Sequence, residues 1–258
     1  MSVTAPRGFR AAGVAAGLGE DGARDVAVVV NDGPSRAAGG VFTGEADRSA
    51  PVLWTAQAVS GGRLRAAVLT TGGSYSGTGP HGFQDVHAVA EHTARLLEDS
   101  AAEIAVCSSG PAGVRPPVDP LNGGIASALT EAGRSGGLSA ADAIRTDDTV
   151  AKIVFRRGDG YTVGAMAKGP DASVGSVQCV LTTDADLTAD QCQSLVAPAA
   201  AAFGTLDSTN DAVLLMASGA TGVRPAPEAL SALLAEVCAA LAVQIRTDTP
   251  TTDHGGRP

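Results

Sequence analysis

A β-hairpin signal in the middle of the chain constrains its fold most strongly. Two alternating apolar runs, VAKIVFRR (150–157) and YTVGAMA (161–167), flank the turn GDG (158–160). This pattern predicts two antiparallel strands joined by a tight turn. A fold wound only from alternating parallel βαβ units has no place for such a hairpin. The sequence therefore predicts an α+β fold, a layered sandwich of helices and mixed sheets.

Further strands and helices are expected on both sides of the hairpin. Short apolar runs predict buried strands, and amphipathic or capped stretches predict helices. The expected strands cover 25–30, 63–70, 103–109, 176–185 and 211–219. The expected helices cover 82–100, 120–133, 139–145, 187–203 and 226–245, and residues 246–258 are expected to form a disordered tail.

Composition argues against several classes of protein. Of the 258 residues, 44% are hydrophobic and 17% are charged, so the chain has a sizeable core and is not globally disordered. A formal net charge of −9 argues against a nucleic-acid surface, which needs clustered Lys and Arg. No run of 18 apolar residues occurs, so we expect no membrane span. The stretch AAGVAAGL (11–18) is interpreted as mature sequence rather than as a signal peptide.

The cysteines and histidines show no metal-binding pattern. Cys107, Cys179, Cys192 and Cys238 are widely spread, and the four histidines are not spaced with them as zinc ligands would be. Four free thiols fit a reducing cytoplasm, although a disulfide pair stays open as an alternative. We therefore expect no metal site.

A glycine-rich loop lies between an expected strand and an expected helix. Gly77, Gly79 and Gly82 match the pattern G-x-G-x-x-G, which is typical of dinucleotide binding in this context. A dinucleotide-binding fold also needs an acidic residue at the end of the next strand, where it holds a ribose hydroxyl. That strand ends in two serines instead. We interpret the loop as a packing feature and rank dinucleotide binding last.

The pair Gly175-Ser176 stands at the start of an expected strand. It is either a turn into that strand or a peptide bond built to be cut, with Ser176 as the nucleophile. A serine hydroxyl can attack the carbonyl of the preceding residue, and glycine leaves that carbonyl uncrowded. Water then opens the ester, and the new N-terminal amine can act as base for its own hydroxyl.

Three other polar stretches are candidates for binding. SSG (108–110) closes a strand and could present backbone N–H groups to an oxyanion, although it is also a common loop end. TDDT (146–149) could hold a polar substrate or cap a turn. Lys168 could bind a carboxylate or lie in solvent.

Nine segments resemble the ornithine acetyltransferase family, also called bifunctional glutamate N-acetyltransferase. They follow the family's order and cover nearly the whole chain, which is more specific than any one motif. The segments are GFRAAGVAAGL (8–18), VVVNDGPSRAAGGVFT (28–43), APVLW (50–54), TGPHGFQD (78–85), CSSGPAG (107–113), AIRTDDTVAK (143–152), GAMAKG (164–169), VLTTDADL (180–187) and STNDAVLLMASGATGV (208–223).

The resemblance implies a self-cleaving enzyme of arginine biosynthesis, with the layered fold of ornithine acetyltransferases and related amide hydrolases. Cleavage at Gly175-Ser176 would divide the chain into an α-chain-like region (1–175) and a β-chain-like region (176–245). Acetyl would move from N-acetylornithine to glutamate through an acyl-Ser176 intermediate. No cofactor is bound, and some members of the family use acetyl-CoA as a co-substrate.

The same resemblance assigns the remaining site residues. Ser109 and Gly110 fall on the family's oxyanion pair, and Thr146 and Lys168 fall on substrate-binding positions. The implied enzyme is cytoplasmic, binds neither nucleic acid nor membrane, and forms a homo-oligomer of α and β fragments once cut.

The sequence also departs from the family pattern. The family has Ala-Thr where this chain has Gly175-Ser176, the segment between Lys168 and Ser176 is shorter, and Pro250 replaces a substrate-contacting Glu. The family's last strands have no counterpart, so we expect a divergent, C-terminally truncated member that acetylates glutamate weakly. A degenerate non-catalytic relative and an amide hydrolase remain as alternatives.

Overall fold

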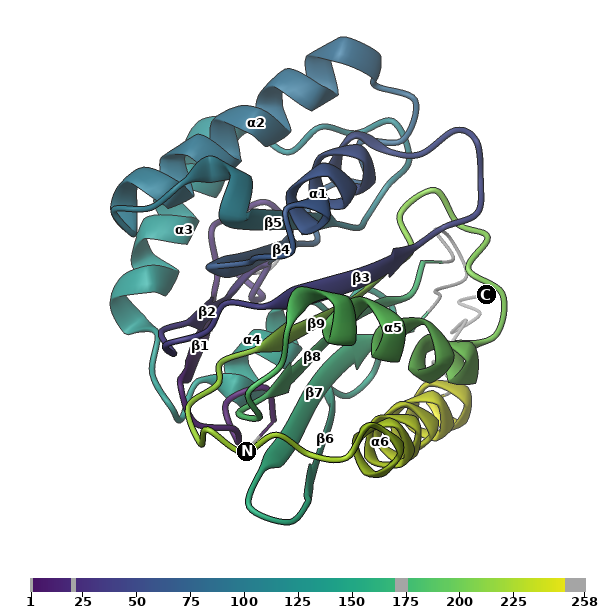
Figure 1. Ribbon diagram of the computed structural model, residues 1–258. Coiled ribbons are helices and arrows are strands. Elements are labelled where there is room, and N and C mark those ends of the chain that lie inside the picture. Colours follow the sequence, from purple (N-terminus) through teal and green to yellow (C-terminus); the bar gives the residue numbers. More distant parts are fainter. Residues whose placement is uncertain (1, 20–21, 170–175, 249–258) are drawn as a thin grey trace.

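Two sheets pack face to face between layers of helices in the computed structural model, which describes residues 2–19, 22–169 and 176–248 (Figure 1). The strand orders are β1-β2-β4-β5 and β3-β9-β8-β7-β6. The strands are β1 (Phe9–Val14), β2 (Val26–Asn31), β3 (Ala38–Phe42), β4 (Ala66–Thr70), β5 (Ile104–Ser108), β6 (Lys152–Arg157), β7 (Thr162–Lys168), β8 (Gln178–Thr183) and β9 (Ala212–Ala217). The helices are α1 (Ala50–Ser60), α2 (Gly79–Leu96), α3 (Val118–Glu131), α4 (Gly137–Ala143), α5 (Ala189–Ala200) and α6 (Pro227–Thr247), and two short 3₁₀ helices cover Ala101–Glu103 and Ala201–Phe203.

Side-chain alternation along the strands explains the layers. In β2, Val26, Val28 and Val30 pack with buried residues of α1, α2 and α3, whereas Ala27 and Val29 face the other sheet. The outer face of the five-stranded sheet packs on α5 and α6, and α4 fits into the core between the sheets (Figure 1). Because both faces of each sheet are buried, the central strands are nearly continuous apolar runs. The expected layered α+β fold is confirmed.

The regions before and after residue 175 share one sheet. β8 pairs antiparallel with β7 and parallel with β9, and β9 pairs antiparallel with β3. The two strands that follow residue 175, β8 and β9, therefore lie between strands that precede it, with β3 on one side and β7 and β6 on the other. The boundary that the sequence places at 175 and 176 divides the chain, but it does not separate two structural domains.

The last helix extends further than the sequence predicted. α6 ends at Thr247, so residues 246 and 247 belong to the helix and not to a loose tail, while Pro250 lies outside the described residues. By length and apolar composition alone α6 could cross a membrane. Its buried residues, among them Leu234, Val237 and Leu241, pack instead against the five-stranded sheet, as those of core helices do.

The predicted elements are all present, with ends that differ by a few residues. The hairpin at 150–167 is formed by β6 and β7, which pair antiparallel from Lys152 opposite Ala167 to Arg157 opposite Thr162. Two strands and one α-helix were not anticipated from the sequence: β1, β3 and α1.

Candidate active site

The candidate residues of β7 and β8 converge on the space between the two sheets. Lys168 ends β7 and pairs in register with Gln178, which begins β8. Met166 and Val180 face the core between the sheets. Because side chains two residues apart share a face, Lys168 and Gln178 point the same way, and Ser176 lies two residues before Gln178.

The hydroxyl of Ser176 lies beside the ammonium of Lys168. Both residues are fully buried, and Lys168 Nζ donates a long hydrogen bond of 3.5 Å to Ser176 Oγ. A cation at this distance stabilises negative charge on the serine oxygen, which favours attack by the hydroxyl. In the uncut chain the nitrogen of Ser176 belongs to a peptide bond, so the amine that would serve as its base does not yet exist.

Ser109 directly follows the end of β5, and the group that it has available as a hydrogen-bond donor is its hydroxyl rather than its backbone N–H. The residue is fully buried, and among the described residues its Oγ has no hydrogen-bond partner. Its backbone N–H donates to the carbonyl of Thr70 over 2.9 Å. We expected this N–H to face an oxyanion, and the structure corrects that expectation because the N–H already has an acceptor. The hydroxyl is the Ser109 donor that remains.

Gly110 occupies a position that only glycine can fill. Its φ is +122°, and a Cβ there would lie 2.8 Å from the nitrogen of Gly73 and closer still to the carbonyl of Thr71. The backbone can turn at this point and approach its neighbours closely because no side chain is present. The assignment of Gly110 to the oxyanion pair stays a prediction.

Gln178 connects the strand that follows Ser176 to the loop that carries Ser109, although the sequence analysis did not single it out. Its Nε2 donates a 2.7 Å hydrogen bond to the carbonyl of Ser108, and its Oε1 is buried without a partner in the described chain. The bond sets how closely the Ser109 loop approaches the strand that follows Ser176. The signal in the sequence was a polar residue at the start of a fully buried strand.

Asp211 is a second residue beside Ser176 that the sequence analysis did not single out. Its Oδ1 accepts a hydrogen bond from the backbone N–H of Val177 (2.6 Å), and its Oδ2 accepts one from the N–H of Ser208 (2.9 Å). Burial raises the pKa of Asp211 from its ordinary 3.8 to about 6, against the opposing effects of the two N–H donors and the Lys168 charge. The residue lies in the STND stretch of a quoted family segment, but its role depends on the pairing of β8 with β9.

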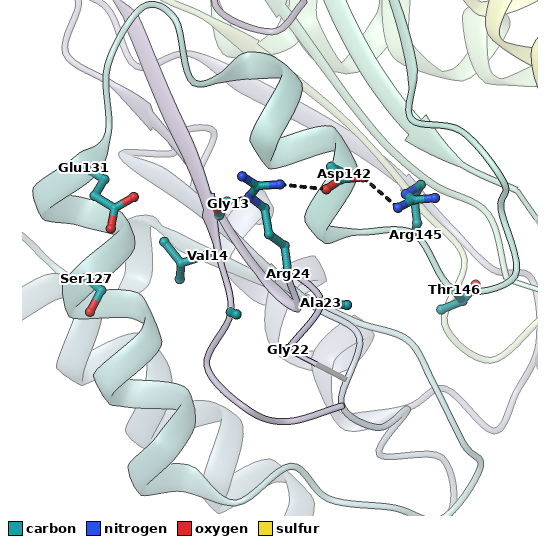
Figure 2. A pocket seen from close by; sticks show the side chains of 11 residues that line it. Gly13, Val14, Gly22, Ala23, Arg24, Ser127, Glu131, Asp142, Arg145 and Thr146 are labelled. Atoms are coloured by element: carbon teal, nitrogen blue, oxygen red, sulfur yellow. Dashed lines mark hydrogen bonds and ion pairs between the residues drawn. The ribbon is translucent and has the colours of Figure 1, made fainter. Parts of the chain in front are cut away.

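Thr146 lines a different cavity, of about 660 Å³, near the ends of β1, α3 and α4 (Figure 2). In this cavity Asp142 bridges the guanidinium groups of Arg24 and Arg145 at 3.0 and 2.8 Å. The hydroxyl of Thr146 is buried and has no partner among the described residues. The structure gives no contact between Thr146 and Ser176.

The Thr146 loop nevertheless reaches the candidate site through Asp148. Asp148 Oδ1 accepts a 3.3 Å hydrogen bond from the backbone N–H of Gly169, the residue after Lys168. The loop is therefore tied to the end of β7, two residues from Thr146.

The third glycine of the glycine-rich loop, Gly82, allows close packing against Thr78. A Cβ on Gly82 would collide with the side chain of Thr78, whose hydroxyl donates to the carbonyl of Tyr75. β4, α2 and β5 do form a parallel crossover, but β5 ends at Ser108, where a dinucleotide-binding fold would have an acidic residue.

The remaining site predictions concern thiols, metals and the scissile bond. The four cysteines are free and buried. Within the described ranges, no group of three His, Cys, Asp or Glu side chains could hold a metal ion. Gly175, on one side of the predicted scissile bond, lies outside the described residues.

Comparison with known proteins points to one family. The ArgJ family model matches residues 10–254. The chain is 54% identical over 257 residues to "Arginine biosynthesis bifunctional protein ArgJ" of Thermobifida fusca, covering 96% of this chain and 67% of that relative. It is also similar to a crystal structure of ornithine acetyltransferase with ornithine from Mycobacterium tuberculosis, with a TM-score of 0.65 and 49% identity over 69% of this chain and 96% of that one.

A more distant likeness concerns the fold alone. An L-aminopeptidase D-Ala-esterase/amidase from Ochrobactrum anthropi, described as a variant of the Ntn hydrolase fold, matches 95% of the chain with a TM-score of 0.55 and 16% identity. The two chains thus share a fold.

Proposed function

Because the chain belongs to the ArgJ family, we propose that it is an acetyltransferase of arginine biosynthesis that moves acetyl from N-acetylornithine to glutamate through an acyl-Ser176 intermediate. The observation that carries this proposal is the buried pair of Ser176 and Lys168, 3.5 Å apart, at the junction of the two sheets. Acetyl-CoA would be a second donor.

Self-cleavage is the step that would create the enzyme. Ser176 Oγ attacks the carbonyl carbon of Gly175, the hydroxyl proton passes to the leaving amide nitrogen, and an ester forms. Water opens the ester, which gives a carboxylate on Gly175 and restores the hydroxyl of Ser176. The new N-terminal amine of Ser176 has an ordinary pKa of about 7.7–8.0, so it can accept a proton near neutral pH.

Acetyl transfer would follow in two half-reactions. The amine of Ser176 takes the proton of its own hydroxyl, and Oγ attacks the acetyl carbonyl of N-acetylornithine. The Ser109 hydroxyl and the Gly110 N–H would stabilise the oxyanion, and the proton then passes to the departing amine of ornithine. The amine of glutamate attacks the acetyl ester next and gives a proton to the Ser176 amine, which passes it to the departing Oγ, so that N-acetylglutamate is released and the Ser176 hydroxyl is restored.

Two further residues would hold the amino-acid part of the substrate. Lys168 is a cation within reach of the reacting oxygen and suits a substrate carboxylate. Thr146 is assigned through the family resemblance, and its loop is tied to Gly169 by Asp148. The enzyme would act in the cytoplasm as an oligomer of paired α and β fragments.

Chain lengths among the relatives support cleavage. The solved mycobacterial chain is shorter than this chain, because 96% of it matches only 69% of these residues. The relative from Thermobifida fusca is longer, because this chain spans 67% of it. A short solved chain beside a long precursor is the relation expected for a family whose members are cut in two.

The assay incubates the purified protein with N-acetylornithine and glutamate and follows ornithine, N-acetylglutamate and acetate by mass spectrometry, with Ser176→Ala as the control. We expect ornithine release and an acetyl group on Ser176 in the wild type and neither in the variant. Acetate without N-acetylglutamate would favour the amide hydrolase. Absence of both ornithine release and an acetyl group on Ser176 would overturn the proposal in favour of a non-catalytic relative.

A further inference from the structure

We propose that Asp211 is a positioning residue for the nucleophile: its carboxylate holds the backbone beside Ser176 so that the hydroxyl stays aligned with Lys168. The inference rests on the proposed function only in naming Ser176 as the nucleophile. Asp211 itself contacts the backbone and not the reacting oxygen.

The residue after the nucleophile is held at both of its backbone groups. The N–H of Val177 donates to Asp211 Oδ1 over 2.6 Å, and the carbonyl of Val177 accepts from the N–H of Ala212 over 3.0 Å. Asp211 and Ala212 are consecutive, so one short segment fixes the peptide units on either side of Val177. Asp211 and Val177 are 2% and 7% exposed, so water competes little for these bonds.

The strand ladder does not supply an acceptor for the N–H of Val177. The register of β7 with β8 ends at Lys168 opposite Gln178, and the register of β8 with β9 begins at Gln178 opposite Ala212. Val177 lies just before both registers. The Asp211 side chain therefore provides the acceptor for the N–H of Val177, which has no partner in the pairing of β8 with β7 or β9.

This hold becomes more important once the chain is cut. Cleavage would turn Ser176 into a chain end, and chain ends fray unless they are tied down. With the link to residue 175 gone, Ser176 is held through Val177, whose N–H is bound by Asp211. A displacement of about 1 Å at a reacting atom can cost roughly 10²-fold in rate.

Asp184 offers a matched control at the opposite end of β8. It too is a buried carboxylate that accepts two backbone N–H groups, from Arg7 (2.9 Å) and Thr162 (2.6 Å). It follows Thr183, the last residue of β8, whereas Ser176 precedes the first. Replacing either aspartate with asparagine puts an NH₂ group in place of one acceptor oxygen, so the two variants carry the same chemical defect.

The experiment compares the wild type with Asp211→Asn and Asp184→Asn. Four quantities are measured: the rate of cleavage before Ser176, kcat for N-acetylornithine, KM for N-acetylornithine, and the rate of hydrogen exchange of the Val177 amide. We expect Asp211→Asn to slow cleavage and to lower kcat by about 10²-fold with little change in KM, because the residue aligns the nucleophile without touching substrate. Val177 exchange should rise in this variant alone.

The outcomes separate this inference from the proposed function. Equal losses of kcat in both variants, or unchanged Val177 exchange in Asp211→Asn, would overturn the positioning role. Faster exchange with unchanged cleavage and kcat would also overturn it. If the wild type neither cleaves nor transfers acetyl, the proposed function fails, and Val177 exchange alone decides whether Asp211 holds this backbone.

Discussion

At the scale of single residues, the Ser109 hydroxyl is the donor whose removal should affect acetyl transfer most directly. Ser109→Ala should lower kcat by about 10²–10³-fold, which is the usual cost of losing one oxyanion donor, and Ser109→Thr should keep most of the activity. Steady-state kinetics with N-acetylornithine measure this. The neighbouring Ser108→Ala is the control, because the Ser108 hydroxyl donates to the carbonyl of Gly73 and not into the site. Equal kcat for Ser109→Ala and wild type would exclude the hydroxyl as an oxyanion donor.

Asp211 should also leave a signature in the pH dependence of stability. Its folded pKa of about 6 lies above the ordinary 3.8, chiefly because of burial, so the folded state binds the proton more tightly than the unfolded state does. The contribution of this proton to the free energy of unfolding is fully present below pH 3.8 and is lost as the pH rises through about 6. The free energy of unfolding of wild type relative to Asp211→Asn should therefore fall across this window in denaturant titrations. A difference that stays constant from pH 3.8 to 6 would contradict the raised pKa.

The site residues predicted from the sequence and those recognised only in the structure differ in the kind of information that identifies them. Ser176, Lys168 and Ser109 stand in short motifs that can be matched locally. Gln178 and Asp211 matter because β8 pairs with β7 and β9 in one register, so that their side chains reach Ser108 and Val177. That register is a long-range property, which no local spacing in the sequence records.

At the scale of elements, a buried ion-pair clasp, formed by Lys152 with Asp148 and Asp248, connects the end of α6 to the loop that precedes β6. The Nζ of Lys152 lies 2.6 Å from Oδ1 of Asp148 and also contacts Oδ2 of Asp248. The side chain of Lys152 is 1% exposed, and those of Asp148 and Asp248 are 7% and 6% exposed. Lys152→Met should cost about 3–5 kcal/mol of stability, because it leaves buried carboxylates without their cation. Urea unfolding measures this loss.

An exposed pair between the same two elements provides the comparison. Arg156 of β6 and Glu236 of α6 form an ion pair with side chains 41% and 56% exposed. Arg156→Ala should change stability by less than about 1 kcal/mol, since solvent screens the pair. Similar losses from Lys152→Met and Arg156→Ala would show that the clasp does not behave as a buried ion pair.

Elements with strong apolar periodicity were predicted, and those without it were missed. β1 (FRAAGV) and β3 (AGGVF) are rich in Ala and Gly, which weakens a strand signal. Both are edge strands, paired on one side only among the described strands. α1 is apolar along most of its length, so its helical period is hidden, although Ser49 and Pro51 mark its start.

At the scale of the whole molecule, the fold should hold the two fragments together after cleavage. β8 follows the proposed cut and lies between β7, which precedes it, and β9. The fragments therefore share a sheet and its core, and they should elute as one species in size-exclusion chromatography without denaturant. Denaturant should separate them. Fragments that part under native conditions would mean that the cut lies elsewhere.

The proposed function depends on Ser176 acting as the nucleophile that cuts the chain before itself. Intact mass spectrometry under denaturing conditions tests it most directly, on the wild type and on Ser176→Ala purified in parallel and incubated for the same time. We predict two fragments from the wild type, the second beginning at Ser176, and one uncut chain from the variant. A wild type that stays whole, or a variant that is cut at the same bond, would exclude Ser176 as the nucleophile of self-cleavage.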